Sequence, residues 1–365
     1  MKKKIIIAGG GTGGHIFPAI AIANAIKKQA PDTEFLFIGA QGKMEMEKVP
    51  QAGYKIEGLD IAGFNRSNLF KNISLPLKLI RSFWKVRKLV NQFQPDAVIG
   101  VGGYSTFPVL RYAQQKGLPT FIHEANSFAG KSNMLLGARA AKIFVGTTDM
   151  EKFFPPEKIM VTGNPVRQSI TGVDAVAKDK ALERFGLKNG ATTILVMGGS
   201  LGAKSINDVI AAHIHEFHSM NIQLIWQTGK NNAGAYKERG KSYANVWVDT
   251  FITDMEMAYA AADIVVSRAG AMSVAEICVV KKPAIFVPYP FAAEDHQTVN
   301  AMHLVSKGAA WLVKDSEAPK ELYSKMVELA KDKAMQMELI AKITPLAIIN
   351  ADEMVATEIL KYIRG

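Results

Sequence analysis

The stretch GGGTGGH, residues 9–15, decides the fold, because it joins an apolar run to a segment with helical character. The run IIIA (5–8) precedes it and PAIAIANAI (18–26) follows it. A glycine loop between a strand and a helix lets backbone N–H groups approach a phosphate, and the helix N-terminus adds partial positive charge. The same arrangement recurs in TILVM (193–197) and GGSLGAK (198–204). Two such units predict two α/β domains that face one site for a phosphate-bearing ligand.

Apolar runs of strand length alternate with helix-like segments along the whole chain. Such alternation is typical of a parallel sheet wound with helices on both faces. We therefore predict two Rossmann-like, doubly wound parallel-sheet domains facing a cleft, with their boundary at GNPVR (163–167) and the polar stretch that ends at Lys180. Ligands of such sheets bind at the carboxyl ends of the strands. The predicted strands are 5–8, 35–38, 97–101, 120–122, 143–145, 193–197, 223–226, 246–248, 264–266 and 284–287.

The length and the cysteine content narrow the class of protein. A chain of 365 residues is long for one core and suits two domains. The single cysteine, Cys278, excludes an internal disulfide framework and fits a reducing compartment, and its surroundings indicate a small buried helix residue. Three lysines at the N-terminus imitate a signal peptide, but glycines, His15 and Pro18 interrupt the apolar stretch that follows. We predict a cytoplasmic protein.

The formal net charge of +11 comes from the first half of the chain, and every charged residue in the segment 61–95 is basic. Helical spacing of apolar residues within 75–90 predicts one face turned to the core. Apolar residues among cations on the other side favour a membrane-surface patch over a solvated helix, and no nucleic-acid-binding motif accompanies the charge. The face turned to the core would consist of Leu79, Phe83, Val86 and Val90. The membrane patch would consist of Leu75, Ile80, Arg81, Trp84, Lys85, Arg87 and Lys88. The other cations of the segment are Arg66, Lys71 and Lys78.

Two other nucleotide motifs are only partly matched. Gly9-x-Gly11-x-x-Gly14 fits the dinucleotide fingerprint, but the next predicted strand ends without the carboxylate that a nicotinamide cofactor needs at its ribose. The segment ANSFAGKS (125–132) resembles a Walker A loop with Ala125 in place of the first glycine. No Asp-x-Asp pair is present, which disfavours a diphosphate held through a metal. We therefore predict neither a metal nor a cofactor.

Three polar residues stand where strands end or helices begin. His15 begins the first predicted helix and Glu124 ends a predicted strand, so both are candidates for a general base. The alternative is a structural role, in which His15 only caps the helix and Glu124 is an ordinary surface residue. Ser273-x-x-Glu276 fits a capping box, in which Glu276 binds only backbone. The same spacing also fits a phosphate on the helix N-terminus and a sugar diol on Glu276. Spacing alone leaves both readings open.

A series of motifs runs along the chain in order: GGGTGGH (9–15), GGY (102–104), HEANS (123–127), GNPVR (163–167), GGSLGA (198–203), FITDM (251–255), SRAGA (267–271) with Glu276, and Gln297. Together they resemble the MurG family of cell-wall glycosyltransferases over essentially the whole chain. The resemblance implies a two-domain glycosyltransferase of the GT-B type. Residues 1–163 would bind the acceptor and the membrane, residues 164–344 the UDP-sugar, and residues 345–365 would form a helix returning to the first domain.

The resemblance also implies roles for individual residues. The donor would be UDP-N-acetylglucosamine, with the backbone of Ile252 on uracil and Glu276 on the ribose hydroxyls. Arg167 and Ser200 would help to hold the nucleotide. The remaining implied contacts are Ala271, Met272, Ser273 and Val274 to the diphosphate, Gln297 and Asn126 to the sugar, and Thr12, Gly13 and Gly14 at the junction with the acceptor.

The implied reaction is an inverting displacement, in which the C4 hydroxyl of the muramoyl sugar of lipid I attacks the anomeric carbon and UDP leaves. His15 would be the general base, with Glu124 as the alternative. The implied partners are lipid I and other proteins of cell-wall synthesis, and no nucleic acid is expected. The protein would be peripheral on the anionic cytoplasmic face of the plasma membrane. Two other hypotheses remain: a UDP-sugar 2-epimerase and a non-catalytic protein of the membrane surface.

Overall fold

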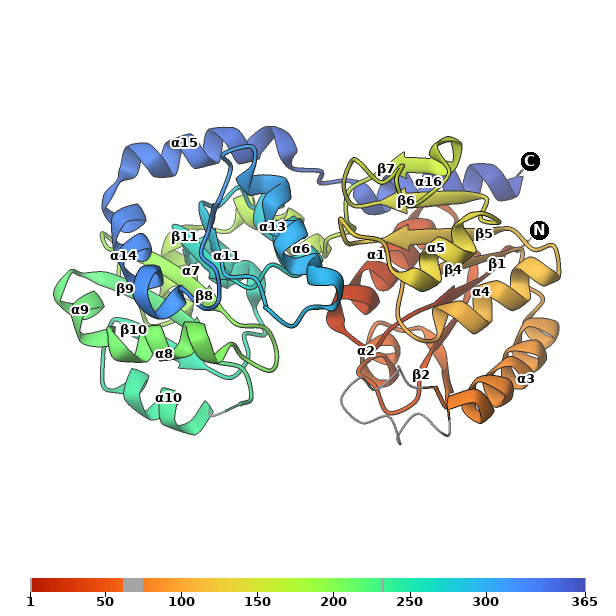
Figure 1. Cartoon of the computed structure of the whole chain (residues 1–365), viewed down its shortest axis with the longest axis horizontal. Coiled ribbons are helices and arrows are strands. Elements are labelled where there is room, and N and C mark those ends of the chain that lie inside the picture. The colour runs from red at the N-terminus through yellow and green to blue at the C-terminus, as the bar shows by residue number, and fades with distance from the viewer. Residues whose placement is uncertain (1, 62–74, 232, 365) are drawn as a thin grey trace. The chain divides into compact units, whose positions relative to one another are not determined.

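The computed structural model, which describes residues 2–61, 75–231 and 233–364, contains two compact α/β units (Figure 1). The chain divides after Arg167 and again after Ile349, so the first unit also includes the C-terminal helix. Each unit is built on one sheet whose strands all run parallel, with helices between successive strands. The predicted fold class of two doubly wound parallel sheets is confirmed.

The first unit has a seven-stranded sheet in the order β3-β2-β1-β4-β5-β6-β7. Every neighbouring pair is parallel, as where Ile5 of β1 lies opposite Phe35 of β2 on one side and Ala97 of β4 on the other. Its elements are β1 (Lys4–Ala8), α1 (Gly13–Gln29), β2 (Glu34–Ala40), α2 (Glu45–Gln51), β3 (Lys55–Leu59), α3 (Leu75–Phe93), β4 (Ala97–Gly100), α4 (Thr106–Gln115), β5 (Thr120–Glu124), α5 (Lys131–Gly137), β6 (Lys142–Val145), η2 (Pro156–Lys158), β7 (Ile159–Val161) and α16 (Ala351–Arg364).

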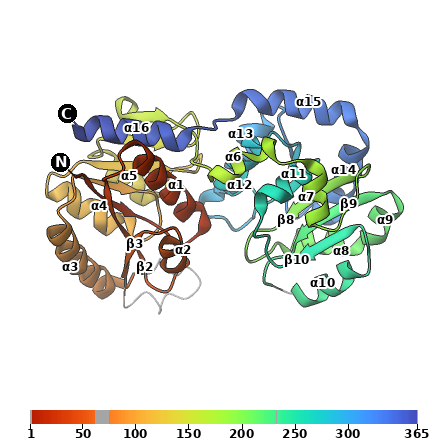
Figure 2. The same cartoon turned by 180° about the vertical axis from the view of Figure 1, so that it is seen from behind.

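Both faces of this sheet are buried, which explains why β1 reads as a continuous apolar run. Ile5 and Ile7 point into a core shared with α1 and α16, whereas Ile6 and Ala8 point into a second core under α3, α4 and α5. Alternate residues of a strand lie on opposite faces, so a strand covered on both sides must be apolar throughout. α16 packs along α1, and Figure 2 shows the pair from behind.

The second unit has a six-stranded sheet in the order β10-β9-β8-β11-β12-β13. Cys278 is buried on α12, as its sequence surroundings predict. The elements are α6 (Gln168–Thr171), η3 (Val173–Ala175), α7 (Lys178–Arg184), β8 (Thr192–Met197), α8 (Lys204–Ala212), α9 (Ile214–Ser219), β9 (Ile222–Gln227), α10 (Ala233–Lys241), β10 (Val246–Asp249), α11 (Met255–Ala261), β11 (Ile264–Ser267), α12 (Ala271–Val279), β12 (Ala284–Phe286), η4 (Ala293–Asp295), α13 (His296–Val305), β13 (Trp311–Leu312), α14 (Ala318–Lys331), α15 (Lys333–Ile343) and η5 (Thr344–Leu346).

The two sheets share one winding pattern. In each, the first strand of the unit lies in the middle, the second and third strands extend one way, and the later strands extend the other way. The winding direction therefore reverses between β1 and β4 and again between β8 and β11. In open α/β sheets the ligand crevice lies outside the carboxyl ends of the strands at this reversal. Each unit thus has one expected ligand position.

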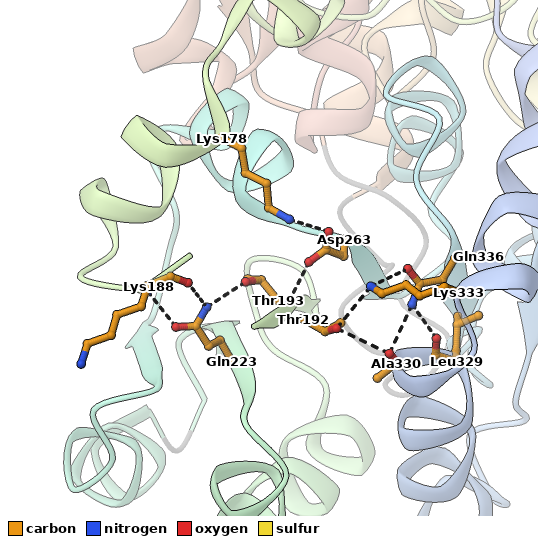
Figure 3. Close-up of polar contacts among 10 residues, drawn as sticks. All are labelled: Lys178, Lys188, Thr192, Thr193, Gln223, Asp263, Leu329, Ala330, Lys333 and Gln336. Atoms are coloured by element: carbon orange, nitrogen blue, oxygen red, sulfur yellow. Dashed lines mark hydrogen bonds and ion pairs between the residues drawn. The ribbon is translucent and has the colours of Figure 1, made fainter. Parts of the chain in front are cut away.

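The amino ends of the strands in the second unit are closed by a polar network (Figure 3). The Gln223 amide donates to the Lys188 carbonyl and to Thr193 Oγ1, and its oxygen accepts the Lys188 N–H. Asp263 accepts the Thr193 N–H at 2.9 Å and pairs with Lys178. These contacts satisfy buried polar groups at the edge of the sheet opposite the expected ligand position, so we assign them a structural role.

Candidate active site

His15 lies in the first turn of α1, directly after the glycine loop. Thr12 is the N-cap residue, and the helix begins at Gly13, so Gly13 and Gly14 contribute N-terminal amides that helices leave without an internal acceptor. The imidazole Nδ1 lies 3.1 Å from the Gly10 carbonyl oxygen and 3.3 Å from Thr12 Oγ1. A Cβ atom at Gly102 would come within 2.7 Å of His15 Cδ2. The ring is therefore held between the loops that follow β1 and β4.

Glu124, the other candidate base, is buried at the end of β5 and its carboxylate is surrounded by donors. Oε1 accepts hydrogen bonds from the backbone N–H and the side-chain amide of Asn126. Oε2 accepts the Gly130 N–H at 3.0 Å and the Asn133 amide at 2.8 Å. The carboxylate thereby fixes the loop that carries Asn126 and the beginning of α5.

His123 precedes Glu124 on β5 and is a buried titratable group. Both of its ring nitrogens are shielded from solvent. Burial lowers the pKa of His123 to about 4, against a smaller raising effect of the Gly163 backbone, and a charge on His15 would lower it further. The ring is therefore neutral at physiological pH.

In the second unit, α12 begins at the point where the winding direction reverses. Gly270 is its N-cap residue, so Ala271, Met272, Ser273 and Val274 form its first turn. Ser273 is thus inside the helix, which excludes the capping-box reading of Ser273-x-x-Glu276. The Glu276 carboxylate instead accepts a hydrogen bond from the Tyr259 hydroxyl at 3.1 Å. A helix N-terminus that carries no acidic residue in its first turn is suited to an anion.

Gln297, near the start of α13, joins the two loops beside this helix. Its side-chain oxygen accepts the Ala269 N–H at 3.1 Å and the Tyr289 N–H at 3.0 Å. Because the oxygen is engaged with backbone, the amide NH₂ is the part of Gln297 suited to a ligand acceptor.

Ser200 is exposed in the loop after β8, where its carbonyl accepts the Lys230 N–H.

A glutamine missed by the sequence reasoning supports Ile252. Gln227 ends β9, and its side-chain oxygen accepts the backbone N–H of Ile252 at 3.1 Å. Its amide also approaches the Gly199 carbonyl at 3.4 Å. Gln227 therefore links the second glycine loop to the segment after β10, although no motif marks it in the sequence.

Two further residues outside the predicted site set organise these loops. Arg268, after β11, donates to the Val287 carbonyl at 2.9 Å and pairs with Asp315. Glu45 lies buried beneath the first glycine loop, where it accepts the Gly11 N–H. Arg268 stands in the quoted motif SRAGA, whereas Glu45 lies in no recognised motif and only its tertiary contacts reveal it. Arg167, which ends the amino-terminal segment of the first unit, lies over the Phe17 ring at 5.0 Å.

The basic helix α3 presents one apolar and cationic surface. Val86 and Val90 are buried, while Leu79 and Phe83 are half-buried. Lys78 and Lys85 pair with Asp60 and Glu57 at 2.8 and 2.9 Å. Arg66 and Lys71 lie outside the described residues, as does the Leu75 side chain. The exposed surface, called here the α3 patch, consists of Leu77, Ile80 (55% exposed), Arg81, Trp84 (66% exposed), Arg87 and Lys88.

Among the described residues, no three side chains of the His, Cys, Asp and Glu types gather in a way that could hold a metal ion. No helix in that part of the chain combines the length and the apolar character needed to cross a bilayer.

The fold and the two strand-end sites define a two-domain glycosyltransferase of the GT-B type. Residues 5–145 match the N-terminal domain of glycosyltransferase family 28, and residues 193–349 match its C-terminal domain. The chain therefore belongs to this family.

Curated relatives match this chain over nearly the whole of their own length. A Bacteroides fragilis protein is 48% identical over 98% of this chain and 95% of its own length, and one from Cytophaga hutchinsonii is 49% identical over 99% and 97%. Both are named UDP-N-acetylglucosamine--N-acetylmuramyl-(pentapeptide) pyrophosphoryl-undecaprenol N-acetylglucosamine transferase. The crystal structure of Acinetobacter baumannii MurG is 28% identical, covers 98% of this chain and 99% of its own, and has a TM-score of 0.76.

A likeness in fold extends to another enzyme class. The UDP-GlcNAc 2-epimerase from Neisseria meningitidis, solved with UDP-GlcNAc bound, matches 98% of this chain with a TM-score of 0.68 at 17% identity. That likeness concerns the fold alone.

Proposed function

We propose that this chain transfers N-acetylglucosamine from UDP-N-acetylglucosamine to the C4 hydroxyl of the muramoyl sugar of lipid I, which yields lipid II for peptidoglycan synthesis. The observation that carries the proposal is the near-complete match, at 48–49% identity, to relatives named for this transfer. The unit formed by residues 168–349 binds the donor. The unit up to Arg167, completed by α16, binds the acceptor.

The donor diphosphate binds the N-terminus of α12 through the first-turn amides of Ala271 to Val274. This assignment is supported by the position of α12 at the reversal of the sheet and by the absence of acidic residues from its first turn. Ser200 and Arg167 contribute to nucleotide binding, and the Ile252 backbone faces uracil. Glu276 holds the ribose hydroxyls while Tyr259 orients its carboxylate.

The donor sugar and the acceptor meet further polar groups. Gln297 offers its amide NH₂ to the sugar, because its oxygen is engaged with Ala269 and Tyr289. Asn126 contacts the same sugar from the loop that Glu124 fixes. Thr12, Gly13 and Gly14 line the acceptor side. The departing UDP is stabilised by backbone N–H groups and helix ends, with no essential metal.

His15 is the general base that takes the proton from the acceptor hydroxyl. A base needs an unprotonated nitrogen within reach of the reacting proton. The alternative, Glu124, is supported less well, because its two oxygens already accept four hydrogen bonds within its own loop.

The enzyme works as a peripheral protein on the cytoplasmic face of the plasma membrane. The α3 patch supports this proposal, since it combines an exposed tryptophan and isoleucine with cations that suit anionic lipid. Lipid I would be taken from the same surface, beside other proteins of cell-wall synthesis.

The deciding experiment measures transfer of radiolabelled N-acetylglucosamine from UDP-sugar to a short-chain lipid I analogue, with and without EDTA. We expect equal transfer in both, and a His15→Ala variant with kcat about 10²–10⁴-fold lower at an unchanged Kd for the donor. Conversion of UDP-N-acetylglucosamine alone to its 2-epimer would instead indicate an epimerase. Absence of both UDP release and epimerisation would indicate a non-catalytic binding protein.

A further inference from the structure

Glu45 is a buried carboxylate that joins the ends of two strands. It is the first residue of α2, and none of its surface is exposed. Oε2 accepts the Gly11 N–H at 2.8 Å, and Oε1 accepts the Ala40 N–H at 2.9 Å. Within the described ranges it makes no ion pair. Burial of a charged carboxylate costs desolvation free energy, and backbone amides without a cation offset only part of it. A carboxylate in such a position therefore calls for an explanation.

Two glycines make room for this carboxylate. A Cβ atom on Gly10 would lie 2.3 Å from Glu45 Cδ, and one on Gly39 would lie 2.5 Å from Glu45 Cγ. A side chain at position 10 would therefore overlap the Glu45 carboxylate, and the φ of +142° at this residue favours glycine independently. The Gly11 amide is likewise occupied, so this N–H is not an anion-binding group.

The Gly11 N–H and the Gly10 carbonyl belong to the same peptide group. Glu45 accepts the N–H end of this peptide, and the carbonyl end lies 3.1 Å from His15 Nδ1. A carbonyl oxygen can only accept a hydrogen bond, so the Gly10 contact, which is the shorter of the two made by Nδ1, favours a proton on that nitrogen, whereas the Thr12 hydroxyl at 3.3 Å can either accept from it or donate to it. The tautomer with the proton on Nδ1 leaves Nε2 as the basic nitrogen of neutral His15. A carboxylate on the N–H end also polarises the peptide and strengthens the acceptor at its other end.

We propose that Glu45 is a positioning residue for His15, which acts through the Gly10–Gly11 peptide to hold the imidazole in the tautomer with a basic Nε2. The contribution of Glu45 to catalysis rests on the proposed function, in which His15 is the general base. Glu45 has the role of a carboxylate that orients a histidine, with one peptide group between the two side chains. At metal sites, removal of the partner that orients a histidine typically costs about 10- to 100-fold in affinity or activity, and we expect a loss of this order here.

The test compares Glu45→Gln with Glu47→Gln, an exposed glutamate two residues later on α2. Glutamine keeps the shape but presents NH₂ to one of the two amides and removes the charge. We expect ¹⁵N NMR of the histidine rings, at a pH where His15 is neutral, to show its proton on Nδ1 in the wild type and in Glu47→Gln. In Glu45→Gln the proton should be shared between both nitrogens, with kcat roughly 10- to 100-fold lower and the KM for UDP-N-acetylglucosamine unchanged.

Each alternative result has a distinct meaning. A proton on Nε2 in the wild type overturns the proposal without any variant, even if Glu45→Gln fails to fold. A fall in kcat with an unchanged His15 tautomer also overturns it, because Glu45 would then only support the fold. A shifted tautomer in Glu45→Gln, together with full activity of His15→Ala, would leave the Glu45–His15 coupling intact and reject His15 as the base.

Discussion

The side-chain oxygen of Gln227 accepts the backbone N–H of Ile252 at 3.1 Å, which ties the end of β9 to the segment after β10. The same side chain approaches the Gly199 carbonyl in the second glycine loop. One buried glutamine thus supports both the segment proposed to face uracil and the loop proposed to face phosphate.

Gln227→Leu should weaken UDP binding. Loss of the acceptor leaves the Ile252 N–H without its partner, so the segment loosens in the free protein and UDP must order it on binding. If this ordering takes about 1–2 kcal/mol from the binding free energy, the Kd for UDP should rise roughly 5- to 30-fold while kcat changes little. Isothermal titration calorimetry measures the Kd. Gln223→Leu is the matched control: the same residue type at the other end of β9, in the network of Figure 3, which should lower stability without altering UDP affinity. Equal affinities for wild type and Gln227→Leu would refute the role.

Glu124→Gln should lower stability as well as activity. An amide NH₂ would then face donors that the carboxylate now accepts, and such a mismatch costs about 1–3 kcal/mol. We expect a lower melting temperature by calorimetry and a partial loss of kcat, because the loop with Asn126 loosens. His15→Ala should show the opposite pattern, with kcat lost and the melting temperature kept. A Glu124→Gln variant with native stability and no activity would identify Glu124 as the base.

His123 should make the folded state acid-sensitive. Its pKa is lowered from 6.5 to about 4 by burial, so below about pH 6.5 the unfolded chain binds a proton that the folded chain refuses. Stability should therefore fall as the pH drops from 6.5 to 4, by roughly 3 kcal/mol from this group. Urea unfolding of wild type and His123→Leu across this range isolates the effect. Parallel pH profiles for the two proteins would contradict the expectation.

The α3 patch should bind anionic vesicles through Arg81, Arg87 and Lys88. Each basic residue near such a surface contributes about 1 kcal/mol, so replacing all three with glutamate should lower the partition coefficient by at least roughly 100-fold. Co-sedimentation at low salt measures it, and added salt should weaken wild-type binding.

The matched control for this patch is the pair Lys78→Gln and Lys85→Gln. These lysines lie on the same helix, but their charges are already paired with Asp60 and Glu57. Vesicle binding that depended on this pair as strongly as on Arg81, Arg87 and Lys88 would show that the α3 patch is not the surface that contacts the membrane.

The sequence predicted the central strands and the edge strand β10, but it missed the edge strands β3, β7 and β13. β1 and β8 are buried on both faces and read as continuous apolar runs that end in glycine loops. β3 has the sequence KIEGL, with polar residues and a glycine, and β13 contains only Trp311 and Leu312. Edge strands pair on one side and are partly solvated, so their composition approaches that of loops. Periodicity therefore could not distinguish them.

The sequence predicted the backbone positions of the candidate site residues but not the partners of their side chains. Strand ends and helix starts indicated where His15, Glu124 and the first turn of α12 would lie. Whether Ser273 caps the helix or Gly270 does was decided only by the backbone around Gly270. Glu45 and Gln227 act through contacts between loops distant in sequence, so no local pattern marks them.

The position of α16 has a consequence for how the protein is made. Val355, Ala356, Ile359 and Leu360 complete the apolar interior that begins with Ile5 and Ile7. The ribosome must therefore synthesise all of residues 168–349 before α16 is available to complete the hydrophobic core of the first unit. Until then the apolar face of α1 that packs against α16 is exposed in the nascent chain. A protein truncated shortly before Ala351 should therefore be prone to aggregation and proteolysis.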